Sequence, residues 1–153
     1  MNDQVTIRTA AKEDFPQWER LWNGYNAFYG RAGETALPLE ITNTTWARFF
    51  DAYKPMHALV AESSNGLLGL AHFLFHRSTI QLAPTCYLQD LFTATEARGK
   101  GVGRALITAV YERAAAAGCP RVYWQTHETN SVAMRLYDAL AERSGFIVYR
   151  KVL

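Results

Sequence analysis

The feature that most constrains the fold of this chain is the stretch of residues 98–104, in which Gly99, Gly101 and Gly103 alternate with other residues. Tyr, Leu and Phe are frequent just upstream, in residues 85–93, and predict a strand. The apolar spacing in residues 102–117 predicts a helix. Alternating glycines weaken helices and strands unless the backbone must turn sharply or approach a ligand closely. The stretch is therefore predicted to be a loop between a strand and a helix N-terminus.

This loop has the chemistry of an anion site. Arg98, Lys100 and Arg104 supply three cations with no acid among them, and a helix N-terminus directs its positive dipole and unpaired amides into the same space. A diphosphate is the ligand that this arrangement favours. A Walker A loop would need Lys-Ser or Lys-Thr after the glycines, and a Rossmann loop would need G-x-G-x-x-G after a first strand. The glycines here run G-x-G-x-G after a fourth strand, so both nucleotide-binding interpretations are weak.

The hydrophobic periodicity of the whole chain predicts a mixed sheet flanked by helices. The Asn65-Gly66 pair predicts a hairpin turn, Asp14 and Asn130 are predicted N-caps, and Gly118 is a predicted C-cap. Hairpin-connected strands come first and helix-separated strands follow, which is typical of an α/β (α+β) fold with a mostly antiparallel central sheet. The predicted strands are residues 5–8, 56–61, 67–76, 85–93, 121–127 and 146–152, and the predicted helices are residues 15–29, 41–53, 102–117 and 131–142.

Composition restricts the class of protein. The chain has 153 residues, and 16 basic against 14 acidic residues leave a formal net charge of +2, which argues against a nucleic-acid partner. Two cysteines, Cys86 and Cys119, are too few for a disulfide framework or a zinc site, so no metal is expected. Residues 1–4 lack the runs of a secretory signal, and the most apolar stretch, residues 66–75, is too short to span a bilayer. We expect a single domain over residues 4–153, cytoplasmic and without a membrane partner.

Three motifs together resemble the GCN5-related N-acetyltransferase (GNAT) family. Residues 98–103, R-G-K-G-V-G, resemble its R/Q-x-x-G-x-G/A loop; residues 87–93, Y-L-Q-D-L-F-T, resemble its fourth strand; and residues 130–137, N-S-V-A-M-R-L-Y, resemble the N-x-x-A-x-x-x-Y stretch of its last helix. The order of predicted elements is similar over about residues 4–153. Within the family, the strand motif and the Tyr-Trp pair before Thr126 look most like the polyamine and the histone-and-polyamine acetyltransferases.

This resemblance implies a GNAT-like acyl-CoA N-acyltransferase fold with acetyl-CoA as the acetyl donor. It also implies direct attack, in a ternary complex, by a primary amine of a small molecule or of a protein. In the family the loop amides hold the pyrophosphate, and a strand backbone pairs with the pantetheine arm. A non-catalytic coenzyme A-binding module and a mononucleotide-binding protein are the alternatives. The implied cofactor-binding residues are Leu91, Phe92, Thr93, Arg98, Gly99, Lys100, Gly101, Val102, Gly103, Arg104, Asn130 and Tyr137.

Tyr137 is also the candidate general acid, because a phenol with an ordinary pKa of about 10 is protonated at neutral pH and can donate to a departing thiolate. The helix pattern alone favours a core role for it. The general base is unassigned. Polyamine-acetylating relatives carry Glu where this chain has Gln89, which cannot accept a proton, and strand alternation places Asp90 on the opposite face. His127 and Glu128, at the end of the next predicted strand, are further candidates.

Two expectations concern the acceptor and the assembly. Tyr29 and Arg31 follow the first predicted helix and are candidates to line the acceptor pocket, whereas His72 and His76 are interpreted as ordinary strand residues. The strand predicted at residues 146–152 would be an edge open to pairing. Relatives in the family commonly dimerise, so a homodimer is expected.

Overall fold

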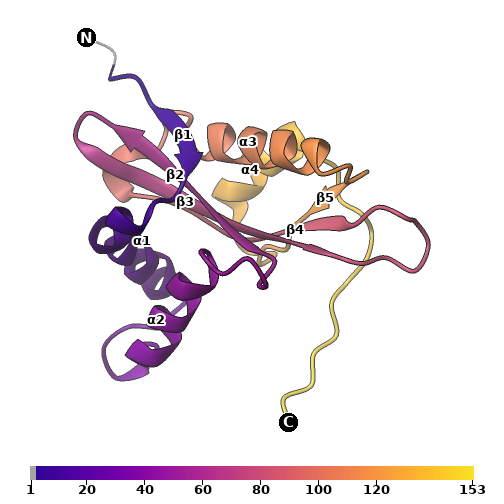
Figure 1. Ribbon diagram of the computed structural model, residues 1–153, viewed down its shortest axis with the longest axis horizontal. Coiled ribbons are helices and arrows are strands. Elements are labelled where there is room, and N and C mark those ends of the chain that lie inside the picture. Colours follow the sequence, from indigo (N-terminus) through magenta and orange to yellow (C-terminus); the bar gives the residue numbers. More distant parts are fainter. Residues whose placement is uncertain (1–2) are drawn as a thin grey trace.

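The computed structural model describes residues 3–153 (Figure 1). Met1 and Asn2 lie outside the described residues. They belong to residues 1–4, for which no secretory signal is expected. Within residues 3–153, five strands form one sheet in the order β1-β2-β3-β4-β5. Neighbours from β1 to β4 are antiparallel, and β5 runs parallel to β4. The strands are β1 (Thr6–Thr9), β2 (Met56–Ser63), β3 (Gly66–His76), β4 (Thr85–Thr93) and β5 (Val122–Tyr123).

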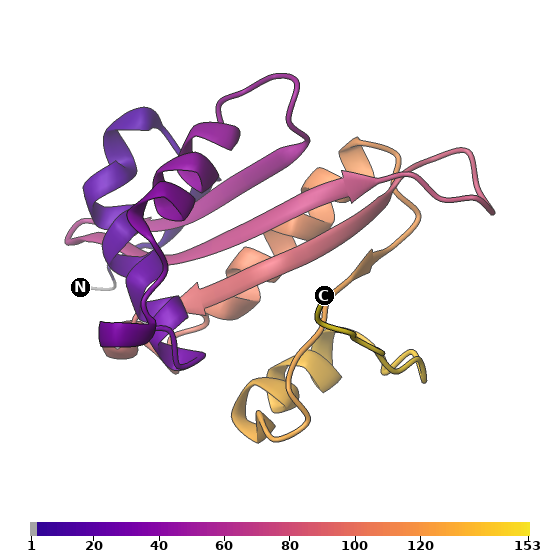
Figure 2. The same cartoon turned by 90° about the horizontal axis from the view of Figure 1, so that it is seen from below.

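Helices cover both faces of this sheet, and the predicted fold class is confirmed. α1 packs on β3 and β4 from one face together with α2, and α3 packs on β2, β3 and β4 from the other (Figures 1 and 2). The apolar residues of α1 repeat at three- and four-residue steps, so Trp18, Trp22 and Tyr25 all face the core. Among residues 3–153 no helix combines the length and the apolar character needed to cross a membrane. The helices are α1 (Phe15–Phe28), α2 (Leu39–Arg48), α3 (Val102–Ala116) and α4 (Ser131–Leu140).

A β-bulge in β4 decides how the residues of the predicted site face. Asp90 lies opposite His72, but Leu88 lies opposite Phe73, so Gln89 is an extra residue without a partner in β3. Gln89 is exposed, whereas Asp90 is only 8% exposed. Asp90 shares a face of the sheet with His72, and the bulge interrupts the simple alternation from which the opposite face was predicted for it.

β4 and β5 separate after two pairs of residues. Cys86 pairs with Val122 and Tyr87 with Tyr123, and the ladder between the two strands ends there. β4 continues to Thr93 with β3 as its partner. The strand predicted at residues 121–127 is therefore shorter than expected. The β4 backbone beyond Tyr87 keeps one side without a strand partner among the described residues.

The strand predicted at residues 146–152 is wrong. Residues 141–153 are in neither a helix nor a strand. Ala141, directly after α4, is fully extended with φ −152° and ψ −177°, so the chain leaves the helix without reversing. The segment then runs away from the sheet (Figure 1). Its residues have strand character, but within this chain they meet no free edge to pair with.

The end of α2 and the start of α1 also differ from the prediction, because nearby carboxylates form other hydrogen bonds and ion pairs. The helix predicted at residues 41–53 ends at Arg48, since the Asp51 carboxylate accepts a hydrogen bond of 2.9 Å from the Tyr53 amide and closes a turn. Asp14 precedes α1 but makes no capping bond to it. Its carboxylate instead pairs with Arg8 at 2.7 Å, which ties the start of α1 to β1.

Candidate active site

The glycine-rich loop has the backbone geometry that its sequence predicted. Gly99 and Gly101 have φ of +76° and +82°, in the left-handed region that favours glycine. Gly101 directly precedes α3, and its carbonyl accepts the first helical hydrogen bond, from Ala105, at 3.0 Å. A Cβ at either position would meet no atom within 4 Å. The loop is thus open on the side of the unpaired amides of the first turn of α3.

The cations of the loop are free to meet a ligand. Arg98, Lys100 and Arg104 are exposed. The guanidinium of Arg98 lies 5.9 Å from the ring centroid of Phe92, and its Nε donates a long bond of 3.4 Å to the Thr93 carbonyl. Arg98 therefore links the loop to the end of β4. Val102 is different, because its side chain is buried in the core and only its backbone can face a ligand.

The end of β4 presents a backbone edge beside the loop. Leu91, Phe92 and Thr93 are half-buried and pair with Ala71, Leu70 and Gly69 of β3. No strand pairs with them on the other side within the described chain. A peptide-like arm lying there can make the hydrogen bonds of an added strand. The αL glycines, the cations and this free edge fit the diphosphate and the pantetheine arm of coenzyme A.

Tyr137 lies on α4 and packs against the edge of the buried core. Its ring packs edge-on against Trp124, with 5.4 Å between ring centroids. Burial raises the pKa of Tyr137 to about 12, and the nearby hydroxyl of Tyr29 contributes to the shift. The phenol is half-buried, and its proton is retained to high pH. Both the core role and the acid role considered from the sequence agree with this position.

Asn130 does not cap α4 through its side chain, contrary to the prediction. Its Nδ2 lies 3.3 Å from the Thr126 hydroxyl, and its backbone carbonyl accepts a bond from Met134 at 3.0 Å. The side chain is tied back to the end of the preceding extended stretch. Asn130 therefore has the predicted N-cap position at the start of α4, but its side chain makes no capping bond.

A buried hydrogen-bonded chain was not predicted from the sequence. The indole Nε1–H of Trp18 donates to Nε2 of His72 at 2.9 Å, and His72 Nδ1 lies 2.9 Å from Oδ2 of Asp90. An indole nitrogen can only donate, so His72 Nε2 must accept and its proton must be on Nδ1, directed at Asp90. His72 is 2% exposed. The available signal was a polar residue within the apolar run of β3, which was interpreted as an ordinary strand position.

Aromatic and cationic residues surround Asp90 on the α1 side. Burial raises the pKa values of Tyr25 and Tyr29, and the negative charge of Asp90 raises both further. The Arg31 guanidinium lies 5.9 Å from the ring centroid of Tyr25 and 5.5 Å from that of Tyr29. The structure thus brings Tyr29 and Arg31 together and adds Tyr25 and Asp90 to the same cluster.

The other base candidates are held elsewhere. His127 Nδ1 lies 2.7 Å from the hydroxyl of Thr129 within its own turn, and both His127 and Glu128 are exposed. His76 Nε2 lies 2.8 Å from the Tyr123 hydroxyl on an exposed surface. None of these contacts links them to the cluster around Asp90.

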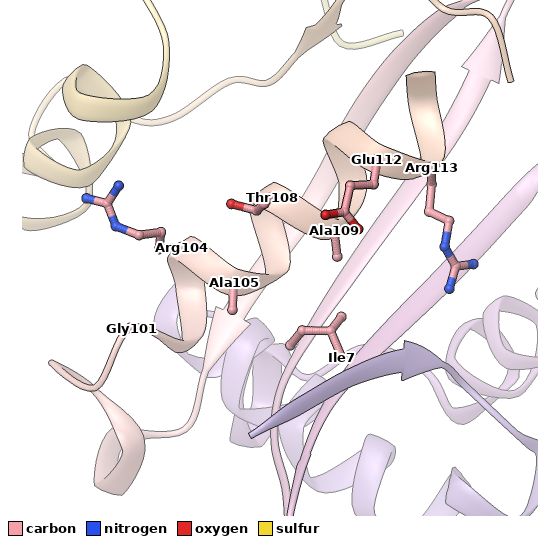
Figure 3. A pocket seen from close by; sticks show the side chains of 8 residues that line it. All are labelled: Ile7, Gly101, Arg104, Ala105, Thr108, Ala109, Glu112 and Arg113. Carbon is pink, nitrogen blue, oxygen red and sulfur yellow. The ribbon is translucent and has the colours of Figure 1, made fainter. Parts of the chain in front are cut away.

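A separate groove of about 420 Å³ runs along the outer side of α3 (Figure 3). It begins at Gly101 and Arg104 and reaches Arg113 at the other end, with Ile7 of β1 opposite. Asp90 and Tyr137 do not line it. The groove is continuous with the loop but lies on the α3 face of the sheet, so it is not the acceptor pocket.

Comparison with known proteins identifies the family. A model of the Acetyltransferase (GNAT) family matches residues 18–141, which is most of the chain. The D-amino-acid N-acetyltransferase HPA3 of Saccharomyces cerevisiae is 35% identical over 153 residues, covering 99% of this chain and 92% of the yeast protein. The thialysine N-epsilon-acetyltransferase of Bos taurus is 35% identical over 92 residues, covering 55% of this chain and 54% of the bovine protein.

Solved structures share the fold. The aminoglycoside acetyltransferase AAC(6')-Iy, in complex with a bisubstrate analogue, superposes with a TM-score of 0.81 at 19% identity, over 98% of this chain and 99% of that one. A probable acetyltransferase superposes with a TM-score of 0.83 at 23% identity, over 97% of each chain. The chain belongs to the GNAT family of acetyltransferases. It is an acetyl-CoA-dependent N-acetyltransferase, which confirms the function expected from the three motifs.

The two ends of α3 offer a matched test of the loop. Gly101 precedes the helix and Gly118 follows it; their φ values are +82° and +79°, and a Cβ at either would meet no atom within 4 Å. Gly101→Ala and Gly118→Ala should therefore lose similar stability, on the order of 1 kcal/mol, from the left-handed backbone. We expect only Gly101→Ala to weaken coenzyme A binding, by about tenfold or more, measured by titration calorimetry. Equal affinity in the two variants would remove the loop from the site.

Proposed function

We propose that this enzyme acetylates the amine of a free amino acid, with Tyr137 as general acid and Asp90 as the group that receives the proton of the amine. Acetyl-CoA, when bound, supplies an activated thioester. Support for its position comes from the loop and from the free edge of β4. The residues proposed to hold it are Leu91, Phe92, Thr93, Arg98, Gly99, Lys100, Gly101, Val102, Gly103, Arg104, Asn130 and Tyr137.

Asp90 is proposed as the base because the neighbouring His72 already uses both ring nitrogens in hydrogen bonds, one to Trp18 and one to Asp90. Protonation of His72 at Nε2 would oppose its proton to the Trp18 indole N–H, which has no lone pair to accept it. His72 therefore acts as a positioning residue that donates from Nδ1 to Oδ2 of Asp90. One carboxylate oxygen is held in this way, and the Tyr25 hydroxyl also lies beside the carboxylate. The proton of the amine is proposed to reach Asp90 directly or through a water molecule.

The proposed reaction is one displacement. The amine, after giving a proton towards Asp90, attacks the thioester carbon; the new C–N bond forms and the C–S bond breaks. Tyr137 donates its phenolic proton to the departing sulfur, and the nitrogen of the new amide gives its second proton to the resulting phenolate. The first proton, held by Asp90, leaves to solvent, so one proton is released in each turnover. Tyr29 is a common neighbour of the two groups: the charge of Asp90 raises the pKa of Tyr29, and Tyr29 contributes to the raised pKa of Tyr137.

The cluster of Arg31 with Asp90 is the observation that carries the choice of an amino acid. A free amino acid has a carboxylate and an ammonium group close together, and Arg31 and Asp90 offer the opposite charges beside the same two tyrosines, Tyr25 and Tyr29. Arg31 is oriented by a 2.7 Å bond from its Nε to Asn26 Oδ1. The yeast relative is named for D-amino acids and the bovine one for thialysine, itself an amino acid. A polyamine is the second candidate. Gln89 disfavours it, because a polycation is attracted by negatively charged side chains and Gln89 is exposed but neutral.

We also propose that the enzyme is a single domain over residues 4–153, that it works in the cytoplasm, and that it forms a homodimer. The composition supports the first two proposals. The third rests on the apolar residues that the chain leaves exposed after α4.

Removal of the Tyr137 hydroxyl tests the general acid. Tyr137→Phe keeps the ring against Trp124, so the fold and the affinity for coenzyme A should change little. The turnover number should fall by roughly 10²–10⁴. Because the pKa of Tyr137 is raised to about 12, the phenol stays protonated up to that pH, and the parent rate should not decline between pH 8 and about 10. A Tyr137→Phe enzyme that keeps its turnover would show that Tyr137 is only a core residue.

Asp90→Asn tests the base at nearly constant shape. At neutral pH kcat/KM should fall by roughly 10²–10⁴, because the ammonium group of the substrate has lost its acceptor. Part of the activity should return at high pH, where free amine is present in solution. Glu128→Gln, an exposed acid made neutral in the same way, is the control and should behave like the parent. A pH profile of Asp90→Asn parallel to that of the parent would exclude Asp90 as the base.

The substrate class is tested by removing the charge on Arg31. Arg31→Gln should raise KM for an amino acid by roughly tenfold or more, because the carboxylate loses its cation. The same variant should leave KM unchanged for the matching amine without a carboxylate. Thiol release from acetyl-CoA measures both, with spermidine as a third acceptor. If the parent uses spermidine and ignores amino acids, the polyamine alternative is correct.

A further inference from the structure

Two tyrosines stand side by side on the sheet, close to Asp90. Tyr87 of β4 pairs with Tyr123 of β5, and their rings are stacked with 4.9 Å between centroids and 22° between planes. The hydroxyl of Tyr123 lies 2.8 Å from Nε2 of His76 on β3, and this contact orients the Tyr123 ring. The tyrosine pair, Tyr87 and Tyr123, has no part in the acid and base chemistry proposed above.

The tyrosine pair lies on the same face of the sheet as Asp90. Asp90 lies opposite His72 of β3. Tyr87 lies opposite Leu74, two residues further along the same strand. Residues two apart on a strand point to the same face, and so do residues directly opposite each other in an antiparallel ladder. Burial raises the pKa of Tyr87, and the nearby Tyr123 hydroxyl and Asp90 carboxylate raise it further, in agreement with this arrangement.

The helices on this face leave the tyrosine pair open. α1 packs on β3 and β4, and both α1 and α2 lie over the end of the sheet that is far from the connection between these two strands at residues 77–84 (Figure 2). β4 begins at Thr85, next to that connection, so Tyr87 lies beyond the cover of the helices. Tyr87 is half-buried and Tyr123 is 38% exposed. A molecule bound at Asp90 can therefore reach the pair.

The charge beside the tyrosine pair favours an uncharged group. Burial raises the pKa of Tyr123, and the positive charge of Arg121 opposes this shift, so the guanidinium is close to the Tyr123 hydroxyl. Arg121 is exposed, and among residues 3–153 it has no ion-pair partner. A cationic side chain placed on the pair would be repelled by Arg121. A neutral aromatic ring, in contrast, can extend the stack of the two tyrosines.

An amino acid that is held by its two charged groups has its side chain left to place. In the proposed function Arg31 meets the carboxylate and Asp90 receives the proton of the amine. The acetyl donor is proposed to lie along β4 from the glycine-rich loop to Leu91, so that direction from Asp90 is occupied. The opposite direction along the same face of β4 leads to Tyr87, which lies beyond the cover of the helices.

We propose that the acceptor is an amino acid with an aromatic side chain, and that its ring lies against Tyr87 and Tyr123. This inference rests on the proposed function and names the substrate class of the same site. The tyrosine pair determines specificity and takes no part in proton transfer. A short aliphatic side chain would leave the two rings uncovered, and a cationic one would meet the charge of Arg121.

The parent enzyme gives the first test. Thiol release from acetyl-CoA is measured with phenylalanine, alanine and arginine, each as both enantiomers; arginine is used because it has a single nucleophilic amine. The better enantiomer of phenylalanine should exceed both other acceptors in kcat/KM by roughly tenfold or more. Equal values overturn the aromatic side chain and leave the proposed acetyl transfer to amino acids intact. Release with none of the amino acids overturns the proposed function, and this inference with it.

Removal of each ring shows whether the tyrosine pair causes the preference. Tyr87→Leu and Tyr123→Leu should lower the ratio of kcat/KM for phenylalanine to that for alanine by roughly fivefold, because the stack is lost. Tyr87→Phe keeps the ring and should keep the ratio. Tyr53→Leu, at a position 94% exposed on the turn after α2, is the control. A purely structural role of the pair would lower both acceptors alike, and the resulting unchanged ratio would overturn the inference.

The charge of Arg121 gives a test that removes no packed ring. Arg121 is exposed, so Arg121→Glu should fold like the parent. It should raise kcat/KM for arginine by roughly fivefold at low salt, less at high salt, and should leave alanine unchanged. Lys54→Glu, which makes the same change of charge at an exposed position after α2, is the control. An equal response of the two variants, or no response of Arg121→Glu, overturns the placement of the acceptor side chain beside the tyrosine pair.

Discussion

The hydrogen-bonded chain from Trp18 through His72 to Asp90 holds together the parts on which the site depends. It connects α1, β3 and β4 through two bonds of 2.9 Å in the interior. Buried polar groups are costly unless they are satisfied, and here each group has its partner. The donor-only indole fixes the tautomer of His72, and His72 in turn fixes the orientation of the Asp90 carboxylate. A packing contact of α1 thus sets the state of a group at the active site.

The bulge at Gln89 determines which residues of β4 lie opposite which residues of β3. Without the extra residue, Asp90 and the residues after it would shift by one position against β3, and every following side chain would change face. With it, Asp90 lies opposite His72 while Leu91 to Thr93 continue as a ladder towards the loop. Gln89 itself has no partner in β3 and is exposed. The residue type that relatives carry at this position therefore matters less here than the carboxylate next to it.

Local rules explain which features were predictable from the sequence. Gly99, Gly101 and the strand–loop–helix order follow from backbone preferences that each residue carries with it, so the loop was predicted correctly. The bond between His72 and Asp90 joins residues 18 positions apart through strand register, which a single sequence does not reveal. The strand predicted at residues 146–152 failed for a related reason. Its residues have strand character, but pairing needs an edge, and local sequence says nothing of where that edge lies.

The helix of the proposed acid and the glycine-rich loop share their packing. Leu136, Tyr137 and Leu140 of α4 pack against the buried core. A Cβ on Gly103 would lie only 3.3 Å from Cδ2 of Leu136, so the first turn of α3 and α4 are in close contact. If the loop holds the donor and Tyr137 protonates its sulfur, as proposed, the acid has to be held within hydrogen-bond reach of the sulfur. The contact between α3 and α4 then holds the two parts in register, so a larger side chain at position 103 should disturb the placement of the acid as well as the loop.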